Sequence, residues 1–248
     1  MPDKERATTN EQAHRVREMF ATIAGRYDLL NHLLSGNIDK RWRRLVAETF
    51  SATLSNSEAR ILDVACGTGD LSLTLFESGP ARIVGVDFCR PMLAIAASKA
   101  RRSKAIIPFV EGDALDLPFG DCSFDAATIA FGLRNLTSVE GGFTELLRIL
   151  KPGGKVAVLE FSRPRTPILR SLFRIYFTKL LPFLGGWISG SKSAYEYLPD
   201  SVSRFPDQDA LAAMMTKAGF ADVSYKNLTG GIAALHIGTR PARQGTYS

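Results

Sequence analysis

The chain has 248 residues, 45% of them apolar, which is enough for one large domain with a substantial core but would leave two full domains cramped. Its formal charge of +6 favours contact with the phosphates of nucleic acid or of lipid and does not choose between them. Three widely spaced cysteines with no CxxC pair argue against a disulfide framework or a metal site, and they favour a cytoplasmic setting.

The first part of the chain is predicted to be helical. Met1–Asn10 is polar and no apolar run reaches about 18 residues, so we expect neither a secretory signal nor a membrane span. Residues 10–54 carry apolar residues at spacings of three and four, which predicts a helical cap with a break near Asn31, Gly36 and Asn37.

Short apolar strands then alternate with helical patterns. Strands are predicted at Ala59–Val64, Arg82–Asp87, Ile106–Glu111, Phe124–Ala130 and Lys155–Phe161, and helices at Asp70–Ser78, Pro91–Arg101 and Val139–Leu150. The last of these helices is followed by a turn signal, Lys-Pro-Gly-Gly, at 151–154. Such alternation predicts a parallel sheet with helices on both faces.

The pattern changes after Phe161. Residues 162–206 form a long insertion rich in aromatic residues and leucine, for which we expect a helical lid. A helix at Asp207–Ala218 and two strands at Asp222–Asn227 and Ala233–Thr239 follow, and the strands are close enough to pair as an antiparallel hairpin. The whole chain, 1–248, is therefore predicted to be one domain with a seven-stranded, mostly parallel α/β sheet.

Ligands in open α/β sheets bind beyond the carboxyl ends of the strands, and distinctive residues stand at four such ends. The first strand is followed by Gly67 and Gly69, which let the backbone approach a ligand closely. Asp87 ends the second strand and suits the two hydroxyls of a ribose. The third end carries Asp113 and Ala114, placed for the amino group of a base, and the fourth carries the run Phe-Gly-Leu-Arg-Asn at 131–135.

These residues favour S-adenosylmethionine (SAM) over a dinucleotide as the ligand. A dinucleotide turn requires G-x-G-x-x-G, and Ser72 stands where its last glycine belongs. Asp70 also places negative charge at the helix start, where a pyrophosphate would sit and where a cationic sulfonium is better tolerated. The expected fold is then the Rossmann-like fold of class I SAM-dependent methyltransferases. A tight turn without a ligand is the alternative reading of the two glycines.

The assembled motifs resemble the ubiquinone/menaquinone biosynthesis C-methyltransferase family, with the closest likeness to its demethylmenaquinone methyltransferases. The resemblance runs from about Val16 to Gly238. It is carried by the sequences RYDLLN at 26–31 with WR at 42–43, DVACGTGD at 63–70, LPF at 117–119, FGLRN at 131–135, LKPGG at 150–154 leading into LEFS at 159–162, YEYLP at 195–199 and AALHIG at 233–238.

The resemblance implies transfer of a methyl group from SAM to a ring carbon of a prenylated hydroquinone, converting demethylmenaquinol to menaquinol. It also implies SAM contacts by Thr68, Asp87, Asp113 and Ala114. The chain departs from the family at Cys89, where a serine is frequent, and at Ala130, where some members carry a SAM-contacting serine. No contact is carried over to Ala130.

A ring carbon becomes nucleophilic when a neighbouring hydroxyl ionises, and a phenol has a pKa near ~10, so the site must assist at neutral pH. Arg134 is the candidate to stabilise the oxyanion or to orient a water that takes the proton, and Asn135 to hold the ring oxygen. A structural ion pair is the alternative for Arg134. Three tyrosines are candidates for the quinone pocket or for the core, namely Tyr27, Tyr195 and Tyr197. Asp28 is expected to be a local cap or turn residue, and no metal site is expected.

The insertion also suggests contact with a lipid surface. Between Phe161 and Tyr195 there are six basic residues and no acidic one. In a helix predicted at 167–184, one apolar stripe about 100° wide is expected, formed by Leu169, Phe173, Tyr176, Phe177, Leu180 and Leu184. Such a helix suits the anionic inner face of a membrane, where a prenylated quinone is met. A lid packed on the core, or on a second subunit of a homodimer, is the alternative.

Other functions remain open at this point. A benzoquinol precursor of ubiquinone could replace the naphthoquinol as acceptor. The basic charge also allows a methyltransferase acting on RNA, but basic residues lie beside apolar ones, which suits lipid better than a phosphate groove, and we expect no nucleic acid partner. The third alternative is a non-catalytic scaffold of the same fold.

Overall fold

The computed structural model describes residues 11, 14–28, 35–175 and 192–242. Seven strands form one sheet in the order β3-β2-β1-β4-β5-β7-β6. All neighbours are parallel except β7, which is antiparallel to both β5 and β6. The strands are β1 Arg60–Val64, β2 Arg82–Asp87, β3 Phe109–Glu111, β4 Phe124–Ala130, β5 Leu150–Phe161, β6 Ala221–Leu228 and β7 Ala233–Thr239. The predicted seven-stranded, mostly parallel α/β fold is confirmed.

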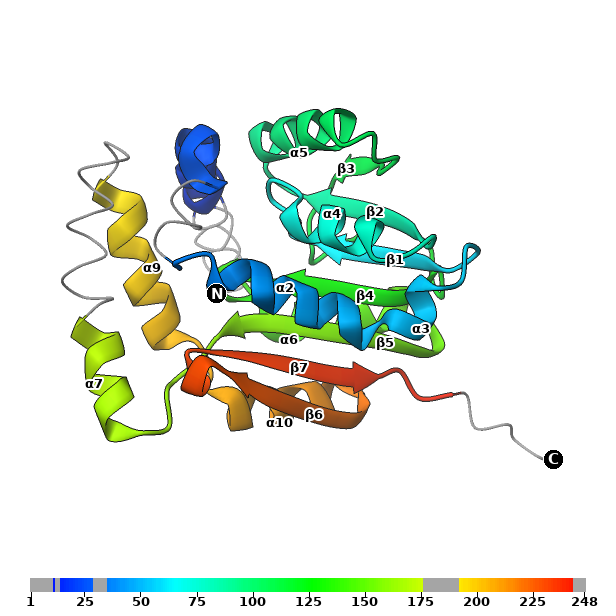
Figure 1. Cartoon of the computed structure of the whole chain (residues 1–248). Coiled ribbons are helices and arrows are strands. Elements are labelled where there is room, and N and C mark those ends of the chain that lie inside the picture. The colour runs from blue at the N-terminus through cyan, green and yellow to red at the C-terminus, as the bar shows by residue number, and fades with distance from the viewer. Residues whose placement is uncertain (1–10, 12–13, 29–34, 176–191, 243–248) are drawn as a thin grey trace.

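Helices cover both faces of this sheet (Figure 1). Capping side chains begin two of them: Ser138 accepts a hydrogen bond from the backbone of Gly141, and Asp207 accepts one from Ala210. Besides the helical residues 14–28, the helices are α2 Ile38–Thr49, α3 Ser51–Leu54, α4 Asp70–Glu77, α5 Arg90–Arg102, α6 Val139–Ile149, α7 Pro167–Ile175, α9 Lys192–Arg204 and α10 Gln208–Ala218, with short 3-10 turns η1 Leu133–Asn135 and η3 Thr229–Gly231.

Alternate strand residues supply two hydrophobic cores, one on each face. In β1, Ile61 packs with residues of α2 and α4, whereas Leu62 packs with residues of α6 and α10. Because successive strand side chains point to opposite faces, strands covered on both sides are apolar along their length. The short apolar runs of the sequence follow from this double cover.

Two strands differ from their predicted limits by more than one residue at an end. The third strand was expected from Ile106 but begins at Phe109, because Pro108 has no N–H to give to a ladder, and Ile106 is 86% exposed. The turn predicted at 151–154 is taken into β5, whose register shifts where β4 passes from Phe124 to Ala126. The helix predicted at 167–184 is observed as α7 to Ile175, and residues 176–184 lie outside the described part of the chain.

The order of the strands reverses between β1 and β4, so the connections from these two strands leave in opposite directions. In Figure 1, the helix of residues 14–28, α7 and α9 lie beyond the carboxyl ends of the parallel strands. This edge is where open α/β sheets bind their ligands.

Candidate active site

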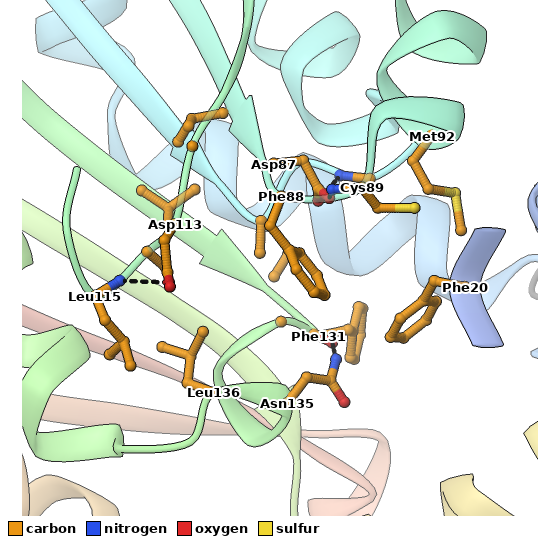
Figure 2. Close-up of a pocket in the computed structure, with 18 of the residues that line it drawn as sticks. Phe20, Asp87, Phe88, Cys89, Met92, Asp113, Leu115, Phe131, Asn135 and Leu136 are labelled. Atoms are coloured by element: carbon orange, nitrogen blue, oxygen red, sulfur yellow. Dashed lines mark hydrogen bonds between the residues drawn. The ribbon is translucent and has the colours of Figure 1, made fainter. Parts of the chain in front are cut away.

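A pocket lies at the carboxyl ends of β1, β2 and β4 and encloses about 810 Å³ including open solvent. Its walls are mainly apolar, and Figure 2 shows Phe20, Phe88, Met92 and Phe131 around the cavity. Three of its polar side chains come from neighbouring strand ends, namely Asp87 at the end of β2, Asp113 after β3 and Asn135 in η1. Apolar walls with a few convergent polar groups are typical of a small-molecule site.

The loop after β1 has a backbone conformation that exposes it to the pocket. Ala65, Gly67 and Gly69 all have positive φ, at 51°, 54° and 81°. A Cβ placed on Gly67 would meet no atom within 4 Å, and Gly67 lines the pocket, so this glycine leaves space for a ligand. At Gly69 the added Cβ would instead lie 3.0 Å from the Ala96 Cβ, so Gly69 also permits close packing of α5.

The Asp87 carboxylate is buried at the base of the pocket. It accepts backbone hydrogen bonds from Gly67 and Cys89, each at 2.8 Å, and thereby ties the β1 loop to the end of β2. Burial raises the pKa of Asp87 above its usual value, against the lowering effect of these N–H donors. Since a carboxylate has about four acceptor positions, it can still accept from ribose hydroxyls.

Asp113 and Ala114 form the next part of the rim. One oxygen of Asp113 accepts a 2.9 Å bond from the Leu115 backbone, which closes a local turn and leaves the other oxygen available to a ligand (Figure 2). Ala114 and Ala130 also line the pocket. The small Ala130 side chain forms part of the pocket wall and carries no hydroxyl group.

These features fit SAM and do not fit a dinucleotide. Asp70 stands at the start of α4 and forms an ion pair with Lys99, so this helix end already holds an anion. Ser72 stands at the position of the third glycine of a dinucleotide turn. Its side chain is fully buried and donates a 2.6 Å hydrogen bond to Asp63. Gly67, Asp87, Asp113 and Ala114 surround a space that suits a nucleoside without phosphates.

Asp28 was expected to be a local cap or turn residue, and that expectation is wrong. Its carboxylate accepts a hydrogen bond from the Thr68 hydroxyl, 40 residues away, and lies 2.9 Å from the Lys99 ammonium. Lys99 also pairs with Asp70, which lies 3.4 Å from Arg43. We call Asp28, Thr68, Asp70 and Lys99 the clasp, because together they join the helix of residues 14–28 to the β1 loop and to α5.

Arg134 forms a buried ion pair. Its Nη1 lies 2.6 Å from a Glu160 oxygen and 2.6 Å from the Phe131 carbonyl oxygen, and only 6% of its side chain is exposed. Its guanidinium also lies over the Phe161 ring. The Nε is buried with no partner among the described residues. Phe131 has a positive φ of 57°, so Arg134 stabilises a strained turn beside the pocket.

Two cysteines lie close to the ligand-binding region: Cys89 lines the pocket, and Cys66 lies in the loop after β1. Cys66 follows Ala65 in the β1 loop, and Cys89 follows Phe88. Burial raises the pKa of the Cys89 thiol, and it raises that of Cys66 well above its usual value, with Asp63 and Asp87 adding to the effect.

Most residues predicted for the site lie together. Gly67, Asp87, Asp113, Ala114 and Asn135 line the pocket, whereas Thr68, Gly69 and Arg134 stand behind its wall. Sequence reasoning missed Phe20, Phe88 and Met92. The apolar spacing of residues 10–54 signalled that Phe20 lay on a helix, but not which surface that helix covers.

The sheet order with its antiparallel β7, together with this pocket, defines a class I methyltransferase that uses SAM. A model of the ubiE/COQ5 methyltransferase family matches residues 7–240. The chain belongs to this family.

Similar proteins have been named in several bacteria. A demethylmenaquinone methyltransferase of Thermus thermophilus is 53% identical over 90% of this chain and all of its own length. A protein of the same name in Deinococcus radiodurans is 46% identical and covers 93% of this chain and 94% of its own. A ubiquinone/menaquinone biosynthesis C-methyltransferase UbiE of Geobacter sp. is also 46% identical, over 93% of this chain and 98% of its own.

Solved structures share the fold at lower sequence identity. A SAM-dependent methyltransferase from Thermotoga maritima, described as a possible histamine N-methyltransferase, has a TM-score of 0.61 at 21% identity and covers 90% of this chain and 98% of its own. A Haemonchus contortus N-methyltransferase in complex with S-adenosylhomocysteine has a TM-score of 0.60 at 16% identity, over 80% of this chain and 52% of its own.

Proposed function

We propose that this protein transfers a methyl group from SAM to a ring carbon of a prenylated hydroquinone, converting demethylmenaquinol to menaquinol. The observation that carries the proposal is the full-length, 53% identical relative named for this reaction. An apolar pocket with three convergent polar side chains supports it. SAM supplies an electrophilic methyl group when bound.

In this proposal the residues of the pocket divide into two groups. Asp87 accepts hydrogen bonds from the ribose hydroxyls, and Asp113 and Ala114 lie beside the base. Gly67 has no side chain, so the cofactor can lie close to the backbone there. Thr68 and Gly69 shape that loop from behind. The other group is the β4 end: Asn135 donates to the acceptor ring oxygen, and Arg134 holds the Phe131 carbonyl and so positions Asn135. Because Glu160 neutralises Arg134, we assign the direct contact to Asn135.

The reaction forms a carbon–carbon bond as the carbon–sulfur bond breaks, and the electron pair of that bond stays on sulfur. The acceptor loses its hydroxyl proton before attack and its ring proton afterwards, and the same oxygen then takes one proton back to give menaquinol, so one proton is released to solvent overall. Positioning and assistance to ionisation are the contributions that this chain can supply.

The proposal is tested with purified protein, SAM and a short-chain demethylmenaquinol, by mass spectrometry of the quinol. We expect a product heavier by one methylene. The Asp87→Ala variant should weaken SAM binding by at least about 100-fold in calorimetry, since a carboxylate that accepts hydrogen bonds is removed.

Asp121→Ala serves as the control, because Asp121 is largely exposed and pairs with Arg148, which lies outside the pocket. Absence of methylated quinol with folded, SAM-binding protein would exclude the proposed reaction. A benzoquinol acceptor is assayed in parallel, since the Geobacter relative is named for both quinones.

Contact with a membrane surface is part of the proposal, on the inner, cytoplasmic face. No helix among the described residues is long and apolar enough to cross a membrane. On α7, however, Ile168 is 78% exposed and Ile175 is 52% exposed, one heptad apart and so on one face. The sequence between Phe161 and Tyr195, which includes α7, carries basic residues and no acidic ones, and this positive charge complements an anionic bilayer.

A further inference from the structure

The side-chain amide of Asn135 is held at both ends. Its Nδ2 lies 3.3 Å from the Phe131 carbonyl oxygen, and its Oδ1 lies 3.0 Å from the Tyr197 hydroxyl. A carbonyl oxygen can only accept, so the amide nitrogen must face Phe131 and the amide oxygen must face Tyr197. The phenol O–H is therefore the donor in the second bond.

Tyr197 comes from a part of the chain remote from the pocket. It lies in α9, within the insertion, 62 residues after Asn135. Burial raises the pKa of its phenol above the usual value, with Arg134 opposing and Glu160 adding to the shift. The phenol thus keeps its proton at neutral pH and remains a donor to Asn135.

Without this bond, Asn135 would be poorly oriented. The bond to Phe131 is long at 3.3 Å, and an amide held only there can rotate about its last torsion. With both bonds in place, one amide N–H is committed to Phe131, and no bond within the described structure uses the other. Asn135 lines the pocket, so this second N–H is available to a ligand.

We propose that Tyr197 is a positioning residue, which orients the Asn135 amide so that its second N–H donates to the oxygen of the methyl-accepting ring. This inference deepens the proposed function and rests on it. Donation to the ring oxygen stabilises the oxyanion over the hydroxyl and lowers the pKa of the bound acceptor. A larger fraction of the acceptor is then ionised at neutral pH.

The consequence is a defect that depends on pH. Loss of one hydrogen bond to a charged group shifts the pKa of the acceptor by about one unit, which lowers turnover about tenfold at pH 7. At a pH near ~10 the acceptor ionises without help, and the rate should recover. A mere loosening of α9 would lower turnover to the same extent at every pH.

The test compares Tyr197→Phe with Tyr225→Phe in turnover assays from pH 6.5 to 10. Tyr225 is a matched control, because its hydroxyl also donates to a side chain, that of Asp209, but it lies on β6 outside the pocket. We expect Tyr197→Phe to lose about tenfold at pH 7, to recover near pH 10 and to bind SAM normally in calorimetry. Tyr225→Phe should match the wild type throughout.

Asn135→Ala extends the test and leaves Tyr197 in place. It should also lower turnover at pH 7 and allow recovery near pH 10. The double variant should be no slower than Asn135→Ala alone, because both changes remove the same contact to the acceptor. If circular dichroism shows that Tyr197→Phe is misfolded, the Asn135→Ala profile alone decides.

A normal rate at pH 7, or a loss equal at all pH values, would overturn the role of Tyr197. Failure of the wild type to methylate any quinol would instead overturn the proposed function, so the two failures are distinguishable.

Discussion

Asp63 is a buried carboxylate inside β1 whose ionisation opposes folding. It is 1% exposed and accepts hydrogen bonds from Ser72 at 2.6 Å and Thr128 at 2.9 Å. Burial raises its pKa to about 6. Between the ordinary value of 3.8 and this value, the folded state binds more protons than the unfolded state. Stability attributable to Asp63 therefore falls as the pH rises through that window.

Asp63→Asn cannot ionise and should remove this part of the pH dependence. The difference in unfolding free energy between variant and wild type should shift in favour of the variant by about 2 kcal/mol from pH 4 to pH 7. Urea unfolding at both pH values provides the measurement. A difference that stays constant between them would show that Asp63 is not the titrating group.

Single residues also show how much of the candidate site could be predicted from the sequence. Asp87 and Asn135 were found because Asp87 ends a predicted strand and Asn135 follows another, and the carboxyl ends of parallel strands share one edge of the sheet. Asp28 was misread, and Tyr197 was predicted only as a candidate for the quinone pocket or for the core, not as a partner of Asn135. Their partners, Thr68 and Asn135, lie 40 and 62 residues away, and neither spacing has a local signature.

At the level of elements, the clasp joins the helix of residues 14–28 to the cofactor loop. Lys99 pairs with both Asp28 and Asp70, so Lys99→Met would remove the cation that the two carboxylates share and leave Asp70 with Arg43. We expect faster hydrogen exchange in residues 14–28 and SAM affinity reduced about tenfold, since like charges repel in a partly buried site.

Lys217→Met is the matched control for this change, because Lys217 occupies the last turn of α10 as Lys99 does in α5. Equal exchange and equal affinity in the two variants would show that the clasp does not hold the helix.

The limits of the elements were predictable to the extent that local rules decide them. The limits of β2 and β4 agree with the predicted ones, since both strands are mainly apolar and contain no proline. The third strand was shortened by Pro108, and the turn at 151–154 was absorbed because β4 pairs with both sides of it. Pairing across the sheet, which a single segment does not encode, sets such limits.

At the scale of the whole molecule, α7 lies beyond the carboxyl ends of the parallel strands (Figure 1), and residues at these strand ends line the pocket. We expect sedimentation with vesicles rich in phosphatidylglycerol and little with phosphatidylcholine alone, because binding requires both apolar burial and charge. Ile168→Ser should reduce this binding about fivefold, at about 25 cal/mol per Å² of apolar surface withdrawn from water, discounted for partial insertion.

Ile106→Ser is the control, since Ile106 is exposed to a similar extent, at 86%, and precedes β3 away from α7. If both variants bind vesicles like the wild type, α7 is not the docking surface. Concentration-dependent dimerisation that Ile168→Ser abolishes would identify a second copy of the chain as the occupant.

The raised pKa values of Cys66 and Cys89 have a consequence for an enzyme that handles an alkylating agent. Sulfur attacks carbon electrophiles as the thiolate, and the neutral thiol is a far weaker nucleophile. Because burial and neighbouring carboxylates favour the protonated form of both thiols, these two cysteines are poor nucleophiles toward a reactive methyl group.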